Sequence, residues 1–261
     1  MSEAIVSPPL KEYGINSRLK MHNYSRVPDH ALAIKQHLQL TEVLRQSGFS
    51  VSYIPEMPNH PNSVFTRDPA VYTKEGYIQL RMELPSRRGE EEWISSFLDS
   101  IEIPRIGSIQ SPATAEGGDI IISGSTVFIG HSSRTNADGI AQISDILRHY
   151  GYHIRVGNVP QPYLHLGGAM TVLAKDLILA VSAVFPDNFF NGFNVIKLFP
   201  ENFISGNVIS NGDGIIIAEE FNIEAIDKLH KAGLQVHALN LSEFIKGTGG
   251  PSCLVLPVKQ D

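Results

Sequence analysis

Short apolar stretches alternate with amphipathic segments along the chain, in a recurring order of strand, polar turn, helix and second strand. Three units show this order clearly, with strand, helix and second strand expected at residues 77–80, 90–98 and 101–103, then 127–129, 140–149 and 152–156, and then 214–217, 223–232 and 234–236. In the middle helix, Ile140, Ile143 and Leu147 fall on one face of a 3.6-residue period, which is typical of an amphipathic helix.

Two further units are less complete. A helix over residues 31–47 and a strand at 49–51 form the first unit, whereas residues 177–181 and 193–198 are two strands of a degenerate fourth unit. The second strands begin near residues 49, 101, 152, 193 and 234. This spacing of about 40 to 50 residues is typical of propellers and other repeat folds. The pattern predicts one domain over residues 1–261, built as a five-bladed α/β propeller.

A doubly wound α/β sheet also alternates strands with helices and is the main alternative. Two features favour the propeller. The strands come in pairs between the helices, and no strand is followed by a glycine-rich turn of the dinucleotide-binding type. No linker or low-complexity stretch divides the chain.

Composition narrows the function classes. The hydrophobic fraction of 42% and the charged fraction of 18% are those of an ordinary globular protein. The net charge of −6 argues against a nucleic acid as partner and favours cationic small molecules. No secretory signal and no membrane-spanning apolar run is apparent, so we expect a cytoplasmic protein without a membrane partner. The oligomeric state, including a homodimer, stays open.

The chain has one cysteine, Cys253, which excludes an intrachain disulfide and suits a reducing compartment. Cys253 follows a glycine-rich turn, residues 247–250, and precedes an apolar strand. A lone cysteine is usually a small buried apolar residue. The glycines instead favour a nucleophile, because they let backbone amides approach a reacting centre. A nucleophilic thiol also needs a nearby base or cation.

His165 and Glu116 are candidates to assist the thiol. His165 lies between apolar residues just before the small-residue turn 167–169, where a structural core histidine is the alternative. Glu116 opens the sequence Glu-Gly-Gly-Asp before an apolar strand, where it is either a turn residue or the acid that orients an imidazole. No histidine or cysteine pair has the spacing of zinc ligands, so we expect no metal and no cofactor.

Two further regions carry polar residues in positions that suggest a ligand. Residues 58–69 place Val64 and Phe65 among polar side chains. Arg87 and Arg134 occupy equivalent turns of two repeats, so the pseudo-symmetry directs both toward one axis. Basic turn residues are commonly just solvated, but two on one face can bind a carboxylate.

Together these segments resemble the guanidine-modifying enzyme superfamily, which has the five-bladed pentein fold and includes dimethylarginine dimethylaminohydrolases, arginine deiminases and amidinotransferases. The resemblance runs in order along the chain and rests on residues 62–68, 86–90, 116–119, 133–136, 164–166 and the turn at Cys253.

The resemblance implies that Cys253 attacks the guanidinium carbon, that His165 protonates the leaving amine, and that Glu116 partners the histidine. It also implies that Asp68 holds the guanidinium and that Arg87 and Arg134 bind the substrate's α-carboxylate. Asn62 and Phe65 are expected in the same substrate pocket. The implied partner is a small guanidino molecule such as arginine or a methylarginine.

Three positions bear on the choice within the superfamily. Arginine deiminases carry an acid two residues after the histidine, where this chain has Gly167. Dimethylarginine hydrolases typically have acids at the positions of Asn62 and Arg67, and the segment 61–69 looks more like a deiminase. We expect a hydrolase that resembles dimethylarginine dimethylaminohydrolase and produces citrulline. An arginine deiminase or dihydrolase and an amidinotransferase are the alternatives.

A different class is a binding protein without chemistry, since a ribosome anti-association factor has the same fold. Such a protein does not need the set Cys253, His165 and Glu116, whose presence favours the enzyme. The segment from Tyr13 to Tyr24 is a candidate lid over the site.

Overall fold

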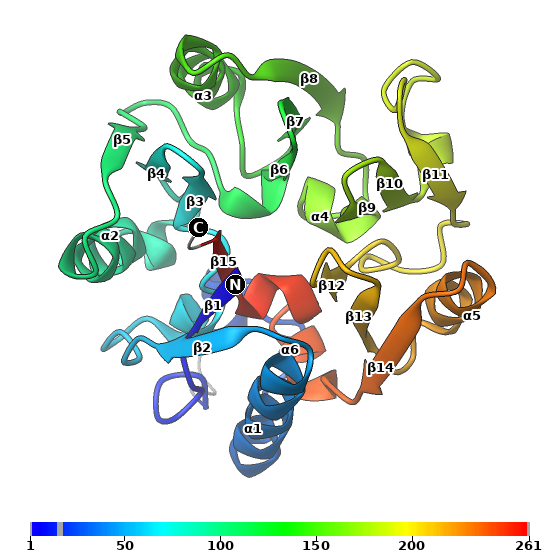
Figure 1. The fold of residues 1–261 in the computed structure, drawn as a ribbon. Coiled ribbons are helices and arrows are strands. Elements are labelled where there is room, and N and C mark those ends of the chain that lie inside the picture. Colours follow the sequence, from blue (N-terminus) through cyan, green and yellow to red (C-terminus); the bar gives the residue numbers. More distant parts are fainter. Residues whose placement is uncertain (1, 15–17, 260–261) are drawn as a thin grey trace.

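The computed structural model describes residues 2–14 and 18–259 and, within them, forms five three-stranded sheets around a centre (Figure 1). In the first sheet, β15 (Leu256–Lys259), β1 (Ser2–Val6) and β2 (Ser50–Tyr53) lie in that order. The second holds β3 (Ala70–Thr73), β4 (Gly76–Gln79) and β5 (Arg105–Ser108). The third holds β6 (Ile120–Ser123), β7 (Thr126–His131) and β8 (His153–Asn158).

The fourth sheet holds β9 (Met170–Ala174), β10 (Leu177–Ala180) and β11 (Asn194–Lys197), and the fifth holds β12 (Val208–Ser210), β13 (Ile215–Glu219) and β14 (Gln235–Leu239). Every sheet repeats one scheme: its middle strand pairs antiparallel with the inner strand and parallel with the outer one. The five-bladed propeller expected from the repeat is therefore confirmed.

Parallel pairs need a crossover, and helices supply it in four sheets. These are α1 (His30–Gln46), α2 (Glu90–Ser100), α3 (Ala137–His149) and α5 (Ile223–Lys231), all on the rim of the ring (Figure 1). In the fourth sheet the crossover between β10 and β11 contains only the 3₁₀ turn Ser182–Val184 among the described residues, as the degenerate repeat predicted. Two short helices, α4 (Leu166–Ala169) and α6 (Ser242–Lys246), lie nearer the centre.

The two ends of the described chain close the ring. β15, the last strand, pairs with β1, the first, in a register that sets Ala4 opposite Pro257. Both ends consequently lie near the centre of the ring (Figure 1). This pairing carries the turn before β15 into the middle of the molecule.

The strand predicted at residues 101–103 is wrong. These residues form a turn after α2, and the strand β5 begins at Arg105. Glu102 has φ of 62°, a left-handed conformation that interrupts an extended strand, and Pro104 follows two residues later. Ile103 still packs against a buried apolar cluster, which explains why its sequence neighbourhood looks like a strand.

In the four sheets that have a crossover helix, core residues pack between the sheet and that helix. On α3, Ile143 and Leu147 are fully buried against Val127 and Ile129 of β7. Burying a side chain of this size stabilises the fold by about 1.5 to 3 kcal/mol. Asn136 accepts a hydrogen bond from the backbone N–H of Gly139 and so begins the helix. In the part of the chain described here, we find no helix with the length and apolar character needed to cross a membrane.

Candidate active site

Loops from several blades meet at a narrow cavity near the centre of the ring. Seven of the eight site residues expected from the sequence line it, namely Asn62, Phe65, Asp68, Arg87, Arg134, His165 and Cys253. The eighth, Glu116, lies directly behind His165. Further lining comes from Asn23, Leu164 and the glycine-rich turn 247–249. The structure thus brings together predicted site residues that lie up to 191 positions apart in the sequence (62 to 253).

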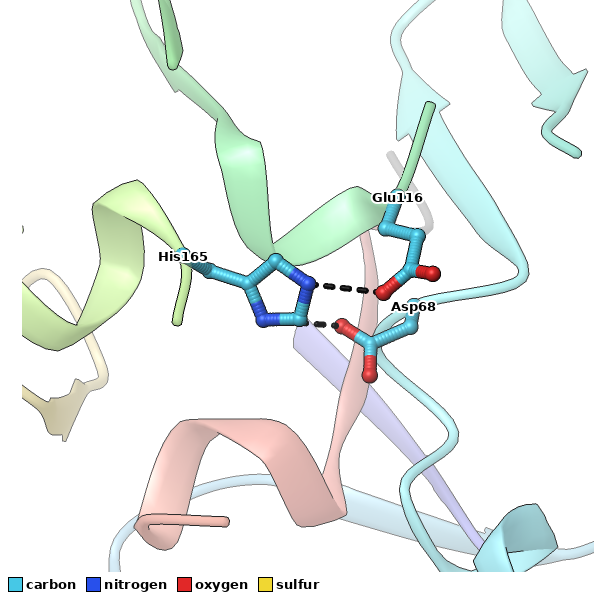
Figure 2. A group of neighbouring side chains, drawn as sticks. All are labelled: Asp68, Glu116 and His165. Carbon is cyan, nitrogen blue, oxygen red and sulfur yellow. Dashed lines mark hydrogen bonds and ion pairs between the residues drawn. The ribbon is translucent and has the colours of Figure 1, made fainter. Parts of the chain in front are cut away.

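His165 is held by a carboxylate on each side of its ring (Figure 2). Its Nε2 lies 2.7 Å from Oε2 of Glu116 and donates a hydrogen bond to that oxygen. Its Nδ1 lies 3.9 Å from Oδ1 of Asp68. Glu116 is fully buried, and its second oxygen accepts from the backbone N–H of Glu83. The imidazole is therefore fixed in orientation before any ligand arrives.

The glycines after Glu116 make room for this arrangement. A Cβ on Gly118 would lie 2.7 Å from both Cγ and Nδ1 of His165, so a larger residue would displace the imidazole. The N–H of Gly118 also donates to Oδ1 of Asp68 at 3.2 Å. The Glu-Gly-Gly-Asp sequence consequently positions both the histidine and the carboxylate facing it.

The surrounding carboxylates keep His165 charged. Burial alone would lower the pKa of His165, but the negative charges of Asp68, Asp119 and Glu116 outweigh it and raise the pKa to about 9. In return, although burial opposes the change, the hydrogen bond from His165 and its positive charge lower the pKa of Glu116. At neutral pH this pair is an imidazolium and a carboxylate.

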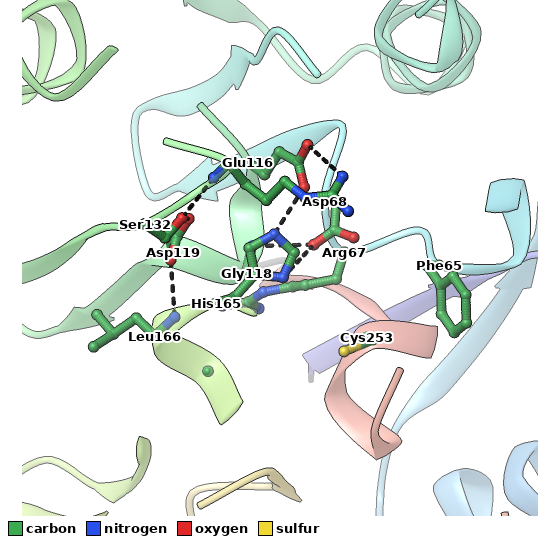
Figure 3. A network of polar contacts seen from close by, with 12 residues as sticks. Phe65, Arg67, Asp68, Glu116, Gly118, Asp119, Ser132, His165, Leu166 and Cys253 are labelled. Atoms are coloured by element: carbon green, nitrogen blue, oxygen red, sulfur yellow. Dashed lines mark hydrogen bonds and ion pairs between the residues drawn. The ribbon is translucent and has the colours of Figure 1, made fainter. Parts of the chain in front are cut away.

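Asp119, the last residue of the motif, is a functional candidate that the sequence did not single out. It is fully buried, and it accepts hydrogen bonds from the hydroxyls of Ser132 and Thr135 and from the N–H of Leu166 (Figure 3). The bond to Leu166 fixes the residue after His165. Burial raises the pKa of Asp119 to about 6. Its place in the motif was the available signal.

Asp68, Glu116 and His165 offer ligand atoms within 4.8 Å of one another, close enough for the three to hold a metal ion. The raised pKa of His165 places a proton on each ring nitrogen at neutral pH, and a metal would have to displace one of them. An ion-paired imidazolium explains the same cluster without a metal.

Cys253 faces this charged group from the opposite wall (Figure 3). It lies in the 3₁₀ turn Pro251–Leu254, just before β15, and its side chain is partly buried. Burial, helped by the charge of Asp68, raises the pKa of the thiol to about 12. The N–H of Gly250 donates to Sγ at 3.4 Å and opposes this rise. In the free protein the thiol is thus protonated at neutral pH.

Arg67 is a second residue whose place only the structure reveals. Its backbone N–H donates to the carbonyl of Cys253 at 3.2 Å, and its guanidinium donates to the carbonyl of Ile120 at 3.1 Å. Its positive charge acts on both Asp68 and Cys253, and it lowers the pKa of the thiol. Arg67 therefore places a cation at a position where dimethylarginine hydrolases typically have an acid.

Arg87 is already bound to protein carboxylates. Its Nη1 lies 2.7 Å from Oδ2 of Asp68, and its Nη2 lies 2.7 Å from Oε2 of Glu90. It is only 4% exposed. Arg134 is less engaged, since its Nη1 lies 3.7 Å from Oε1 of Glu116. The two arginines share the cavity but differ in how many donors remain for a ligand.

Asn62 and the segment His22–Asn23 lie together at one side of the cavity. The Nδ2 of Asn62 donates to the carbonyl of His22 at 3.1 Å, while its buried Oδ1 has no partner among the described residues. Asn23 exchanges hydrogen bonds with Thr248. Of the candidate lid, Tyr13 to Tyr24, Asn23 thus lines the cavity and His22 is bonded to Asn62, while residues 15–17 lie outside the described chain.

Phe65 packs against the glycine-rich turn. A Cβ on Gly249 would lie 2.2 Å from the Phe65 ring, so only glycine allows this approach. The rings of Tyr13 and Phe65 form a T-shaped pair, with 6.0 Å between the centroids. Phe65 thereby connects the glycine-rich turn before Cys253 to Tyr13 of the candidate lid.

Comparisons with known proteins find relatives that match over most of the chain. The profile of the family described as N,N dimethylarginine dimethylhydrolase, eukaryotic, matches residues 14–259. The N(G),N(G)-dimethylarginine dimethylaminohydrolase of Pseudomonas aeruginosa is 31% identical over 229 residues, which cover 88% of this chain and 89% of the relative. A solved structure of that enzyme type from Pseudomonas aeruginosa, a cysteine-to-serine mutant complexed with citrulline, matches with a TM-score of 0.87 and 29% identity over 98% of each chain. The arginine deiminase of Listeria innocua is 25% identical over 331 residues, covering 98% of this chain and 81% of the relative.

Proposed function

The chain belongs to the dimethylarginine dimethylaminohydrolase family, and from this premise we propose that it hydrolyses a C–N bond in the guanidine group of arginine or an N-methylated arginine. The products are citrulline and either ammonia or an amine. The observation that carries the proposal is the cavity in which Cys253 faces the His165–Glu116 pair and Asp68. Together they supply a nucleophile, an acid and an anionic site for a cation.

Binding of the cation prepares the thiol. A substrate guanidinium beside Asp68 brings positive charge close to Sγ of Cys253, which favours the thiolate over the thiol. The thiol proton passes to solvent. The same charge offsets Asp68, one of the causes of the raised pKa of Cys253. Binding of a cationic substrate therefore raises the thiolate fraction of Cys253 at neutral pH.

The chemical steps follow from the protonation states. The thiolate of Cys253 attacks the central guanidinium carbon and forms a C–S bond. The imidazolium of His165 gives its proton to the departing nitrogen, which leaves as ammonia or an amine. Neutral His165 then takes a proton from water as the water oxygen attacks the same carbon. The C–S bond breaks, and citrulline and the thiolate are released.

The far end of the substrate requires other residues. We assign Arg87 and Arg134 to the α-carboxylate, with Arg134 the more available because its ion pair with Glu116 is the longer one. Binding through Arg87 requires it to share or leave Asp68. The unpartnered Oδ1 of Asn62 is an acceptor suited to a substrate N–H, and the ring of Phe65 lines the same pocket.

We propose an N-methylated arginine as the preferred substrate, because this chain has Gly167, and so no second carboxylate, where arginine deiminases carry an acid. An unsubstituted guanidinium would lose a charge-assisted hydrogen bond there. Arginine deimination is the second candidate, favoured by Asn62 in place of an acid and by the 25% identical deiminase. A cytoplasmic location belongs to the same proposal and is supported by the single cysteine.

Product analysis separates these activities. The protein is incubated with arginine, monomethylarginine, asymmetric dimethylarginine and agmatine, and the products are identified by mass spectrometry. Citrulline and dimethylamine from dimethylarginine support the first candidate, and citrulline and ammonia mainly from arginine support deimination. Ornithine with two equivalents of ammonia indicates a dihydrolase, and transfer to an added amine indicates an amidinotransferase. No turnover of any guanidine would contradict the proposal.

A further inference from the structure

Asn207 connects two sides of the active site: the turn that holds Cys253 and the segment that follows His165. It lies directly before β12, on a blade that contributes neither Cys253 nor His165, and its side chain is 2% exposed. Its Nδ2 donates to the carbonyl of Gly167 at 2.9 Å and to Sγ of Cys253 at 3.8 Å. Its Oδ1 accepts from the N–H of Ser252 at 2.9 Å. Both amide hydrogens and the amide oxygen are thus used, and every partner lies within two residues of the histidine or the cysteine.

The absence of a side chain at Gly250 makes room for the amide of Asn207. A Cβ on Gly250 would lie 2.6 Å from Oδ1 of Asn207, which is buried and held by Ser252. The φ of Gly250 is −98°, a value open to any residue, so backbone conformation does not require glycine here. The close approach of the amide explains the glycine.

The chemistry of the amide suits a thiolate. Two N–H groups are directed at Sγ, from Gly250 and from Asn207, and both stabilise the anion over the thiol. Burial and Asp68 act in the opposite direction. An aspartate at this position would have the same shape, but it would lose the donor and add a negative charge beside the sulfur.

We infer that Asn207 is a positioning residue for the reaction, which sets the Cys253 sulfur against the His165 segment and donates to the thiolate once it forms. The inference rests on the proposed function only in taking Cys253 as the nucleophile. Asn207 acts through the cysteine, and it ties the turn before β15 to the start of α4, two elements that no strand pairing joins.

Asn222 offers a matched control. It is also a buried asparagine, 1% exposed, and its Nδ2 donates to the carbonyls of Ile204 and Ser205 in the loop that leads to Asn207. Within the described part of the chain, its side chain forms no hydrogen bond with the turn that holds Cys253. Asn207→Asp and Asn222→Asp therefore place the same change in the same part of the fold, one beside the thiol and one away from it.

The test measures the rate of iodoacetamide alkylation against pH for the wild type and both variants. Because Cys253 is the only cysteine, the reaction reports one thiol, and it needs no substrate. We expect Asn207→Asp to move the profile upward by about one pH unit or more, and so to slow alkylation about tenfold at a fixed pH below the midpoint. Asn222→Asp should leave the profile in place.

Gly250→Ala probes the same contact from the other side without adding charge. It should displace the amide and shift the alkylation profile in the same direction, and it decides the matter if Asn207→Asp does not fold. In steady-state assays both variants should lower kcat more than they raise KM. An unshifted profile in a folded Asn207 or Gly250 variant, or an equal shift in Asn222→Asp, would overturn the inference. Failure of the proposed hydrolysis would instead appear as absent turnover in the wild type with the thiol profiles unaffected.

Discussion

The two walls of the cavity differ sharply in how their charges are arranged. On one wall, His165 is surrounded by Asp68, Glu116 and Asp119, and the pKa of its imidazole rises to about 9. On the other, Cys253 lies in a glycine-rich turn with a few N–H donors and one cation nearby, and the pKa of its thiol rises to about 12. The first wall carries an ion pair between His165 and Glu116, whereas the thiol on the second wall is uncharged at neutral pH.

This difference teaches how the site stays inactive without a ligand. In the proposed mechanism, the imidazolium of His165 can act as an acid at neutral pH, whereas the thiol of Cys253 is not yet a thiolate. A cation that enters between the walls adds positive charge beside Asp68, which already pairs with Arg87, and so favours the thiolate. A guanidinium is such a cation, so this asymmetry agrees with the substrate class in the proposed mechanism.

Replacing Cys253 by serine removes the nucleophile from the neutral wall and should have the largest effect. A serine hydroxyl is almost wholly protonated near neutral pH, so turnover should fall by at least about a thousandfold. Circular dichroism and the melting temperature should match the wild type, because the sizes are similar. Activity above about a tenth of the wild type would show that the sulfur does not do the chemistry.

Glu116→Gln tests the charged wall. The glutamine keeps an acceptor near Nε2 of His165 but removes the charge, so the pKa of His165 should fall and kcat should drop about a hundredfold. Because the acid must be protonated, the alkaline limb of the kcat–pH profile should move to lower pH. Glu91→Gln is the control, since this buried carboxylate accepts from Met82 and Gly89 and does not touch His165. If the alkaline limb of the kcat–pH profile stays in place in Glu116→Gln, then Glu116 does not set the pKa of the catalytic acid.

Agmatine tests whether Arg134 and Arg87, beside the charged wall, bind the substrate's α-carboxylate. It has the guanidine but lacks the α-carboxylate, so its kcat/KM should be about a hundredfold below that of the carboxylated substrate. Arg134→Gln should erase much of this difference, mainly by raising KM for the carboxylated substrate. Equal efficiency on both substrates in the wild type would remove Arg134 and Arg87 from this role.

Arg67→Gln makes the neutral wall still less favourable to the thiolate, and it should have the smallest effect. Loss of the cation raises the pKa of Cys253, so kcat/KM at neutral pH should fall about tenfold, and the deficit should shrink as the pH rises. Arg81→Gln is the control, because Arg81 also donates to a backbone carbonyl, that of Ala113. A deficit independent of pH, or equal in both variants, would indicate a structural role for Arg67.

Local patterns predicted much of the fold. The helices at α1, α2, α3 and α5 agree with their predicted ranges to within a few residues, because a 3.6-residue apolar period is a property of neighbouring positions. The strand expected at 101–103 failed for a local reason as well, since the left-handed conformation of Glu102 is not visible in an apolar alternation. The closing pair of β1 and β15 joins the two ends of the chain, and no local pattern announces it.

The sequence by itself determined which residues gather at the centre: the repeat places equivalent turns on one axis, and the motifs around Asp68, Glu116, His165 and Cys253 all reach one cavity. Only the tertiary structure decided their state. Arg87 pairs with Asp68, and the cation of Arg67 lies close enough to the thiol to lower its pKa. The amide of Asn207 bonds to both Gly167 and Cys253. Local sequence does not predict these contacts, because they depend on how separate segments fold together. Protonation depends on burial and on distances between charges, and these quantities exist only once the blades have closed.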